Sequence, residues 1–427
     1  MGADAQAARV LLPAHPSSVP VARRAIREWL LEIGCEALAE DAELAVSELV
    51  TNALVHAGTP VEMVARVDVG FVRIEVADGS VHLPRVREYA ATASTGRGLK
   101  LLDRTVDRWG AHRHGAGKVV WFELSSDEQD AGEPRLEPAD VPPPAANSVA
   151  VELLNLPLLL HAAWLEHAET LMREYLLVRL DSTDPGEALE LHAAASEALT
   201  VLAEQVPRPE LDDDPDILMA GAVEPYVTLP RLVIRVPVAS ILPFDAMDAA
   251  MDDARELAAG GLLMTPPTQP EVRALRRWLC SEIRGQAAGE HPRPWASLFE
   301  PGHVPDVSPV DWPSSSVDDS PSPVLAADDA NRIVAISESA LAHLGYEDRS
   351  ELVGRRLVAL IPARFHQAHL AGFTLHLSNG RSPLLDRPVT VPVVRRDGTE
   401  RLTELTVTAQ NLPGGRKVFL AELRTVD

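Results

Sequence analysis

The chain has 427 residues, 46% of them apolar, and a formal net charge of −24. This length predicts two to four domains, each with enough apolar residues for a core. The negative charge argues against nucleic acid or an anionic membrane as partner and favours a protein partner. Two cysteines, Cys35 and Cys280, are too few for a disulfide framework, and no apolar run reaches membrane-span length. We therefore expect a cytoplasmic protein.

Two helices are predicted near the N-terminus. Residues 20–34 form the first, and the second begins near its predicted cap Asp41 and contains the segment AVSELVTNALVHA. On this second helix Glu48 and Asn52 lie one turn apart, away from the apolar face. A carboxylate and an amide so placed can accept a proton and hold a divalent cation. The simpler interpretation is a helix with a solvated polar edge.

A hairpin and a glycine-rich turn follow. Residues 61–67 and 72–76 alternate as two strands, and the second strand runs into Asp78-Gly79-Ser80. The sequence Gly96-Arg97-Gly98 then opens a predicted amphipathic helix, and a last strand spans 118–124. The residues expected to share the inner face of that helix are Leu99, Leu102, Val106 and Trp109. Backbone N–H groups at such a helix start are suited to bind phosphate.

Together and in this order, the Glu-x-x-x-Asn, Asp-Gly, Gly-Arg-Gly-Leu and Gly-Lys motifs resemble the Bergerat-fold ATPases. That superfamily includes gyrase B and the catalytic domains of sensor histidine kinases. Within it, the chain is most similar to the bacterial anti-sigma-factor serine kinases. The resemblance covers residues 8–125 and implies an α/β two-layer sandwich that binds ATP and Mg²⁺.

The same resemblance implies roles for individual residues. Glu48 matches the general base, Asn52 the magnesium ligand, and Asp78 the carboxylate that reads the adenine amino group. The other residues implied in nucleotide binding are Gly79, Gly96, Arg97, Gly98, Leu99, Gly117 and Lys118. Many members carry Asp-x-Gly-x-Gly, whereas in this chain Val81 follows Ser80. We expect this shortened motif to affect closure of the lid over the phosphates and to leave recognition of adenine by Asp78 intact.

The middle of the chain resembles no family. An acidic, proline-rich linker at 126–148 leads to a helical region at 149–286, interpreted as a bundle or dimerisation module. Its helices are predicted at 158–180, 187–206, 244–259 and 269–285, and prolines exclude a central strand from the extended stretch at 225–243. Its histidines, His161, His167 and His192, are expected to be ordinary helix-surface residues.

After a second linker at 287–319, residues 320–425 predict a different unit. Strand, turn, strand and short helix come first, and three strands close the chain, two of them joined at Asp397-Gly398. This order resembles PAS sensor domains, whose sheet curves around helices and can enclose a ligand. His369 lies where haem-binding PAS domains carry their axial histidine. The arginine of such oxygen sensors has no match, because Arg387 is off register, so flavin or no ligand is favoured over haem.

The sequence thus predicts a multidomain α+β protein with an ATPase domain, a helical middle region and a PAS domain. The corresponding function is an anti-sigma-type kinase that phosphorylates a serine or threonine on an antagonist or sigma-factor-like regulator, under PAS control. One alternative is a module that holds ATP and sequesters a transcription regulator without catalysis. Another is an atypical sensor histidine kinase phosphorylated at His167, disfavoured because few residues precede the first helix. The helical and PAS regions are the candidate surfaces for a homodimer.

Overall fold

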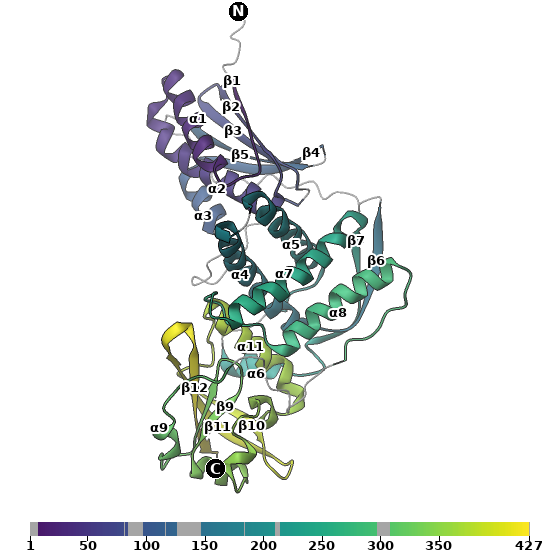
Figure 1. Cartoon of the computed structure of the whole chain (residues 1–427), viewed down its shortest axis with the longest axis vertical. Helices are drawn as coiled ribbons and strands as arrows, with labels where there is room; N and C mark the ends of the chain where they lie inside the picture. Colours follow the sequence, from purple (N-terminus) through teal and green to yellow (C-terminus); the bar gives the residue numbers. More distant parts are fainter. Residues whose placement is uncertain are drawn as a thin grey trace, which may run out of the picture. The chain divides into compact units, whose positions relative to one another are not determined.

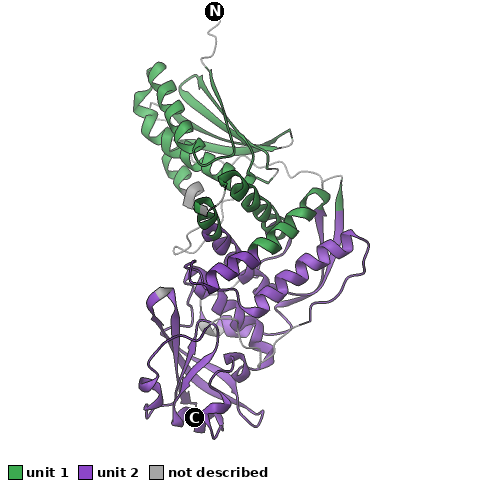
Figure 2. Ribbon diagram, viewed as in Figure 1, with its two compact units in different colours: residues 1–148, 175–202, 237–250 green, residues 149–174, 203–236, 251–427 purple. Residues whose placement is uncertain are grey.

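The computed structural model describes residues 7–80, 82–83, 97–115, 117–125, 147–182, 184–209, 214–296 and 308–426 (Figure 1). The chain divides into two compact units (Figure 2). Unit 1 comprises residues 1–148, 175–202 and 237–250, and unit 2 comprises residues 149–174, 203–236 and 251–427. Within the described ranges, no helix has the length and apolar character needed to cross a bilayer.

Unit 1 is built on a five-stranded antiparallel sheet with the strand order β1-β2-β3-β5-β4, and helices cover one of its faces (Figure 1). The strands are β1 (Ala7–Leu12), β2 (Val61–Asp68), β3 (Phe71–Asp78), β4 (Arg108–His114) and β5 (Gly117–Ser125). The helices are α1 (Ser18–Glu32), α2 (Ala39–Ala57) and α3 (Arg97–Thr105). This is the predicted two-layer arrangement of helices on a sheet.

The local sequence explains these elements. Val61, Met63 and Ala65 of β2 are buried and alternate with partly exposed residues, which is the pattern of a strand with one face on a core. Gly70 adopts a φ of +87° in the turn between β2 and β3, a conformation that glycine enters without strain. The predicted apolar face of α2, including Val46, is buried against this sheet.

Among the boundaries in unit 1 that differ from the prediction, those of α2 and α3 change the placement of named residues. Helix α2 begins at Ala39, because a 3₁₀ turn at Glu36–Leu38 precedes it, so Asp41 lies in its first turn rather than at its cap. Helix α3 ends at Thr105, and Trp109 lies on strand β4. Leu102, Val106 and Trp109 are nevertheless all buried. Their spacing is that of one helical face, but Leu102 lies on α3, Val106 follows α3 and Trp109 lies on β4.

The middle of the chain is mainly helical, as predicted. The helices are α4 (Leu158–Ser182), α5 (Pro185–Gln205), α6 (Pro215–Gly221), α7 (Ile241–Ala259) and α8 (Pro270–Ala287). Strands β6 (Ser148–Pro157) and β7 (Thr228–Pro237) form a two-stranded sheet, in which neither strand is central. The proline-rich stretch therefore does contain a strand, at an edge position that tolerates Pro230.

The three histidines of the helical region are buried, so the expectation of surface residues is wrong. His161, His167 and His192 are 2%, 3% and 8% exposed. His161 packs edge-on against Trp164, with ring centroids 5.6 Å apart. Burial lowers the pKa of His161 to about 3 and that of His167 to about 4, so both imidazoles are neutral. These helices have apolar residues on more than one face and pack against several neighbours. The histidines between those faces are therefore buried, although an isolated helix would expose them.

The C-terminal part of unit 2 is a five-stranded antiparallel sheet with the strand order β10-β11-β12-β8-β9. The strands are β8 (Val324–Asp328), β9 (Ile333–Ile336), β10 (Pro388–Val394), β11 (Glu400–Asn411) and β12 (Lys417–Thr425). Helix α10 (Glu338–Leu344) packs its apolar residues on one face, and Phe373 of helix α11 (His366–Asn379) contacts Phe419 of β12 with ring centroids 5.1 Å apart. The tight turn between β10 and β11 has Gly398 at a φ of +80°, as the Asp-Gly pair predicted.

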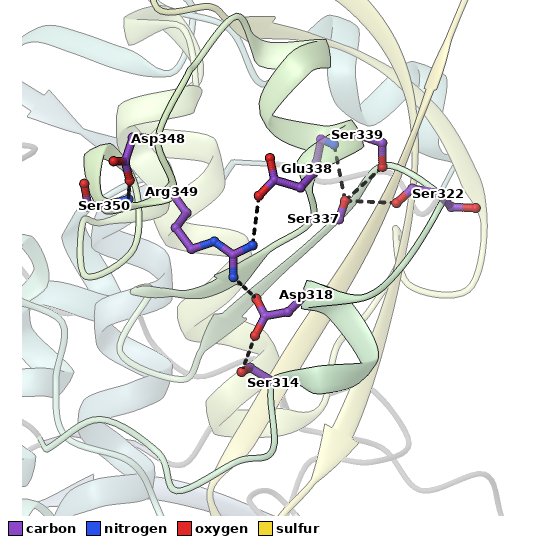
Figure 3. Close-up of polar contacts among 10 residues, drawn as sticks. Ser314, Asp318, Ser322, Ser337, Glu338, Ser339, Asp348, Arg349 and Ser350 are labelled. Atoms are coloured by element: carbon purple, nitrogen blue, oxygen red, sulfur yellow. Dashed lines mark hydrogen bonds and ion pairs between the residues drawn. The ribbon is translucent and has the colours of Figure 1, made fainter.

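The other face of this sheet is covered by the segment that precedes it. Val317 of the short helix α9 (Ser315–Asp318) is fully buried against Ala326, Ala335 and Val418. Arg349 donates hydrogen bonds to Asp318 at 3.0 Å and to Glu338 at 2.9 Å (Figure 3). Ser314 also donates to Asp318. These contacts fasten α9 to the sheet and to the start of α10.

The PAS sheet and its helices are joined to the helical region within unit 2. The Gln367 side chain of α11 accepts a hydrogen bond from the Leu159 N–H at 2.9 Å, where α4 begins and helix N–H groups lack partners. His167 of α4 bonds Ser378 through Nδ1 and Thr268 through Nε2. Arg356 forms a buried ion pair with Glu271 of α8.

We predict that Glu271→Gln destabilises this junction by about 3 kcal/mol, because it leaves the Arg356 guanidinium buried without its countercharge. Hydrogen–deuterium exchange of peptides from α8 and β8–β9 measures the free energy of local unfolding. The matched control is Glu400→Gln, which breaks the exposed Arg364–Glu400 pair and should cost less than about 1 kcal/mol. Equal effects of the two substitutions would contradict the prediction.

Candidate functional site

Helix α2 holds the predicted polar pair on its outer edge. Glu48 and Asn52 are both partly exposed, whereas Leu49, Val50 and Ala53 between and beside them are buried in the core. The helix is therefore anchored by its apolar face, and the carboxylate and the amide one turn apart remain accessible. Both supply the oxygen atoms that Mg²⁺ prefers.

Asp78 ends strand β3 and is buried in an ion pair. Lys118 lies opposite it in the β3–β5 register, and its Nζ donates to Asp78 Oδ1 at 2.9 Å. The Ser80 N–H donates to the same oxygen at 2.8 Å. Burial raises the pKa of Asp78, and the Lys118 ammonium and the Ser80 N–H oppose this rise without cancelling it. Among the described residues, both of these bonds go to Oδ1 and none goes to Oδ2.

Two glycines permit this close approach. A Cβ on Gly117 would lie 2.0 Å from the backbone oxygen of Asp78, so only glycine fits at the start of β5. A Cβ on Gly79 would lie 2.8 Å from the Thr59 side chain. The Gly79 N–H donates to Thr59 Oγ1 at 2.9 Å. Thr59 comes just after the end of α2, so it ties the end of that helix to the turn after β3.

The structure brings Asp78, Gly79, Gly117 and Lys118 together, and places Glu48 and Asn52 on the helix that Thr59 links to them. No direct bond joins Glu48 or Asn52 to Asp78 among the described residues. Gly96 lies outside the described residues. Arg97, Gly98 and Leu99 form the first turn of α3 in the described backbone.

Helix α5 contacts both sides of this arrangement. A Cβ on Gly58, which caps the C-terminus of α2, would lie 2.7 Å from the Ala193 side chain, and His56 Nδ1 lies 2.8 Å from Ser196 Oγ. His82, beyond the turn after β3, places its Nε2 3.0 Å from a carboxylate oxygen of Glu197, and Ser240 donates to Glu197 at 2.8 Å. Burial tends to raise the pKa of Glu197, but these two partners outweigh burial and lower it, so its carboxylate is charged.

Sequence reasoning did not find Thr59, His82 or Glu197. Thr59 follows a glycine that ends a helix, a position that could have marked it as a helix-terminal contact. His82 and Glu197 meet only because α5 folds back within unit 1, where Ala188 and Leu189 join the same core as α2. No local pattern signals that long-range contact.

Comparisons with known proteins identify two families. Residues 12–124 match the family model of the histidine kinase-like ATPase domain, and residues 314–426 match that of the PAS fold. An uncharacterized protein of Azorhizobium caulinodans is 36% identical over 104 residues, which are 24% of this chain and 14% of that protein. Uncharacterized protein SCO4941 of Streptomyces coelicolor is 34% identical over 109 residues, which are 24% of this chain and 96% of that protein. A solved PAS domain of an HTR-like protein from Haloarcula marismortui is 28% identical, covers 26% of this chain and 88% of its own, and gives a TM-score of 0.22.

We predict that Gly117→Ala destabilises the end of the β3–β5 ladder by about 2 kcal/mol or more, because the new Cβ overlaps the Asp78 carbonyl. Hydrogen exchange of peptides from β3 and β5 should speed up accordingly. Gly221→Ala is the control, since a Cβ there meets no atom within 4 Å. Unchanged exchange of β3 and β5 in the Gly117 variant would contradict the prediction, because the strands would then accommodate the new Cβ without loss of stability.

Proposed function

Since the chain belongs to the histidine kinase-like ATPases through residues 12–124 and carries a PAS fold at 314–426, we propose that it is an ATP-dependent signalling regulator. The reaction we propose is transfer of the γ-phosphate of ATP to a serine or threonine of a protein partner, as in anti-sigma-factor kinases. The partner is an antagonist or a sigma-factor-like regulator. The net charge of −24 favours a protein partner over nucleic acid.

The accessible Glu48–Asn52 pair on α2, linked through Thr59 to the turn after Asp78, is the observation that carries this proposal. Asn52 would hold Mg²⁺ through its amide oxygen, together with water and the phosphates, and the bound metal would offset phosphate charge. Glu48 would take the proton of the incoming hydroxyl. Asp78 would accept a hydrogen bond from the adenine amino group, with Lys118 holding its carboxylate in place.

Control by the PAS domain would reach this site through α5. This helix packs on the end of α2, which carries Glu48 and Asn52, and through Glu197 it holds His82 beyond Asp78. A shift of α5 would therefore change both sides of the proposed nucleotide site at once. Such control requires two states of the helical region that differ in their affinity for ATP or for the partner.

A second function is favoured by one feature of the segment that follows Asp78. His82 stands where the second glycine of Asp-x-Gly-x-Gly falls, and its side chain is engaged by Glu197. A loop held in this way is suited to retain nucleotide without turnover. In that case the chain would sequester a transcription regulator by contact alone.

A sensor histidine kinase acting through His167 receives no support from the geometry. This side chain is 3% exposed, and its two ring nitrogens bond Ser378 and Thr268. A phosphoacceptor must reach the γ-phosphate of ATP, and a neutral imidazole engaged on both nitrogens is poorly placed to attack it.

We predict that Asp78→Asn weakens ATP binding at least tenfold, because an amide in place of the carboxylate presents a poorer acceptor to the adenine amino group. Isothermal titration with ATP and Mg²⁺ measures the affinity, and circular dichroism checks that the variant is folded. Asp68→Asn, at the exposed last residue of β2, is the control and should bind like the wild type. A folded Asp78 variant with wild-type affinity would remove Asp78 from the site.

We predict that Glu48→Gln lowers phosphoryl transfer by a factor of about 100 or more while ATP affinity changes little, because it removes the proton acceptor and keeps the shape. Transfer of ³²P from γ-labelled ATP to candidate antagonist proteins measures the rate. Glu40→Gln, at an exposed position of the first turn of α2, is the control. Binding of ATP by the wild type without transfer at any Mg²⁺ concentration would eliminate the kinase and leave the sequestering module.

A further inference from the structure

Unit 2 contains a cavity of about 310 Å³ between the PAS sheet and helix α11. Its walls are aliphatic and aromatic, with Leu325, Val391 and Phe419 on the sheet and Phe373 on α11. The side chains with polar atoms that line it are His369, His376, Arg381 and Ser382. Each buried water needs two to four polar partners, and a cavity of this composition offers few of them.

The two histidines reinforce the apolar character. Burial lowers the pKa of His369 to about 3 and, with Lys417 nearby, also lowers that of His376, so both rings are neutral. His369 Nε2 lies 2.8 Å from the side-chain amide nitrogen of Asn331, which donates to it. Because that nitrogen already accepts a bond, the arrangement does not favour haem ligation through His369 Nε2.

Part of the wall comes from outside the PAS fold. Leu159 of α4 and Leu218, Met219 and Ala222 in and beside α6 all line the cavity. Leu159 and Ala222 are buried in one apolar cluster with Ala371 and Leu375 of α11. A molecule in this cavity would therefore touch the PAS domain and the helical region at the same time.

We propose that this cavity binds a small, uncharged, apolar molecule, and that α4 and α6 respond directly to its presence. The volume is roughly twice that of a 150 Å³ apolar cavity known to take up benzene, so an occupant of about 10–12 carbon atoms fits. Transfer of such a molecule from water removes its apolar surface and that of the cavity wall from solvent. A carboxylate would be excluded, because Arg381, the cationic side chain among the described lining residues, already interacts with the charge of Glu166 and the rest of the wall offers no countercharge.

Gly372 of α11 offers a direct way to test occupancy. It lines the cavity, has an ordinary helical backbone, and a Cβ built on it meets no atom within 4 Å. A larger side chain at this position can therefore enter the open space, and replacing a mid-helix glycine also improves helix propensity. Gly372→Leu should fill the cavity, whereas Gly372→Ala leaves most of it open and serves as the matched control.

The experiment is calorimetric titration of the full chain with naphthalene as the uncharged probe and 2-naphthoate as its charged counterpart. The wild type and Gly372→Ala should bind naphthalene with affinities within about threefold of each other, and Gly372→Leu should bind at least tenfold more weakly. Ala421→Leu, which adds volume from strand β12, repeats the test if Gly372→Leu does not fold. Absence of naphthalene binding by the wild type, unchanged binding in both filled variants, or equal binding of 2-naphthoate would each overturn the proposed site.

Hydrogen exchange with and without naphthalene tests the second half of the proposal. Peptides from α6 and the first turns of α4 should exchange more slowly when the probe is bound, together with those of α11. Slower exchange confined to α11 and the PAS sheet would overturn the role of α4 and α6. Neither measurement involves ATP, so failure of this site and failure of the proposed kinase are distinguishable.

Discussion

The buried pair of Asp78 and Lys118 is the constraint on which unit 1 depends. Each side chain is 8% exposed or less, so a lone charge left behind by losing either partner would be costly. The pair also fixes the register of β3 against β5, because a slip of one residue would turn Lys118 to the opposite face of the sheet. Gly117 allows the two strands to come close enough for it. The register of β3 against β5 and the position of the candidate-site carboxylate of Asp78 therefore depend on the same contact.

Unit 2 likewise depends on buried polar contacts, which join the PAS domain to the helical region. Gln367 of α11 satisfies the Leu159 N–H at the start of α4 and donates to Thr228 Oγ1 at 3.1 Å, so one PAS side chain joins α4 to the strand β7. Arg356 adds a buried link to Glu271 and Gln269 at the start of α8. The PAS sheet is therefore part of a larger packed body, and its interior is bounded by helices that belong to the middle of the chain.

The sequence carried most of the local structure. Alternation in β2 and β3, the apolar face of α2 and the long pattern of α4 all depend on neighbouring residues, so each could be predicted within a few positions. Strands β1 and β4 escaped prediction, because β1 is a short edge strand and β4 follows directly on a helix whose apolar spacing it continues. For the candidate site, motif order pointed to Glu48, Asn52 and Asp78, whose roles stay predictions. Thr59, His82 and Glu197 depend on tertiary contacts over long chain separations, which no local spacing encodes.

The path of the chain has a consequence for how such a protein can be taken apart or recombined. It passes from one unit to the other at residues 148–149, 174–175, 202–203, 236–237 and 250–251. A fragment cut after the last strand of the ATPase sheet would lack Leu176, Ala188 and Leu189, which complete its core. A single breakpoint therefore cannot move either unit whole into another gene, and a graft of unit 1 has to carry the interleaved helices with it.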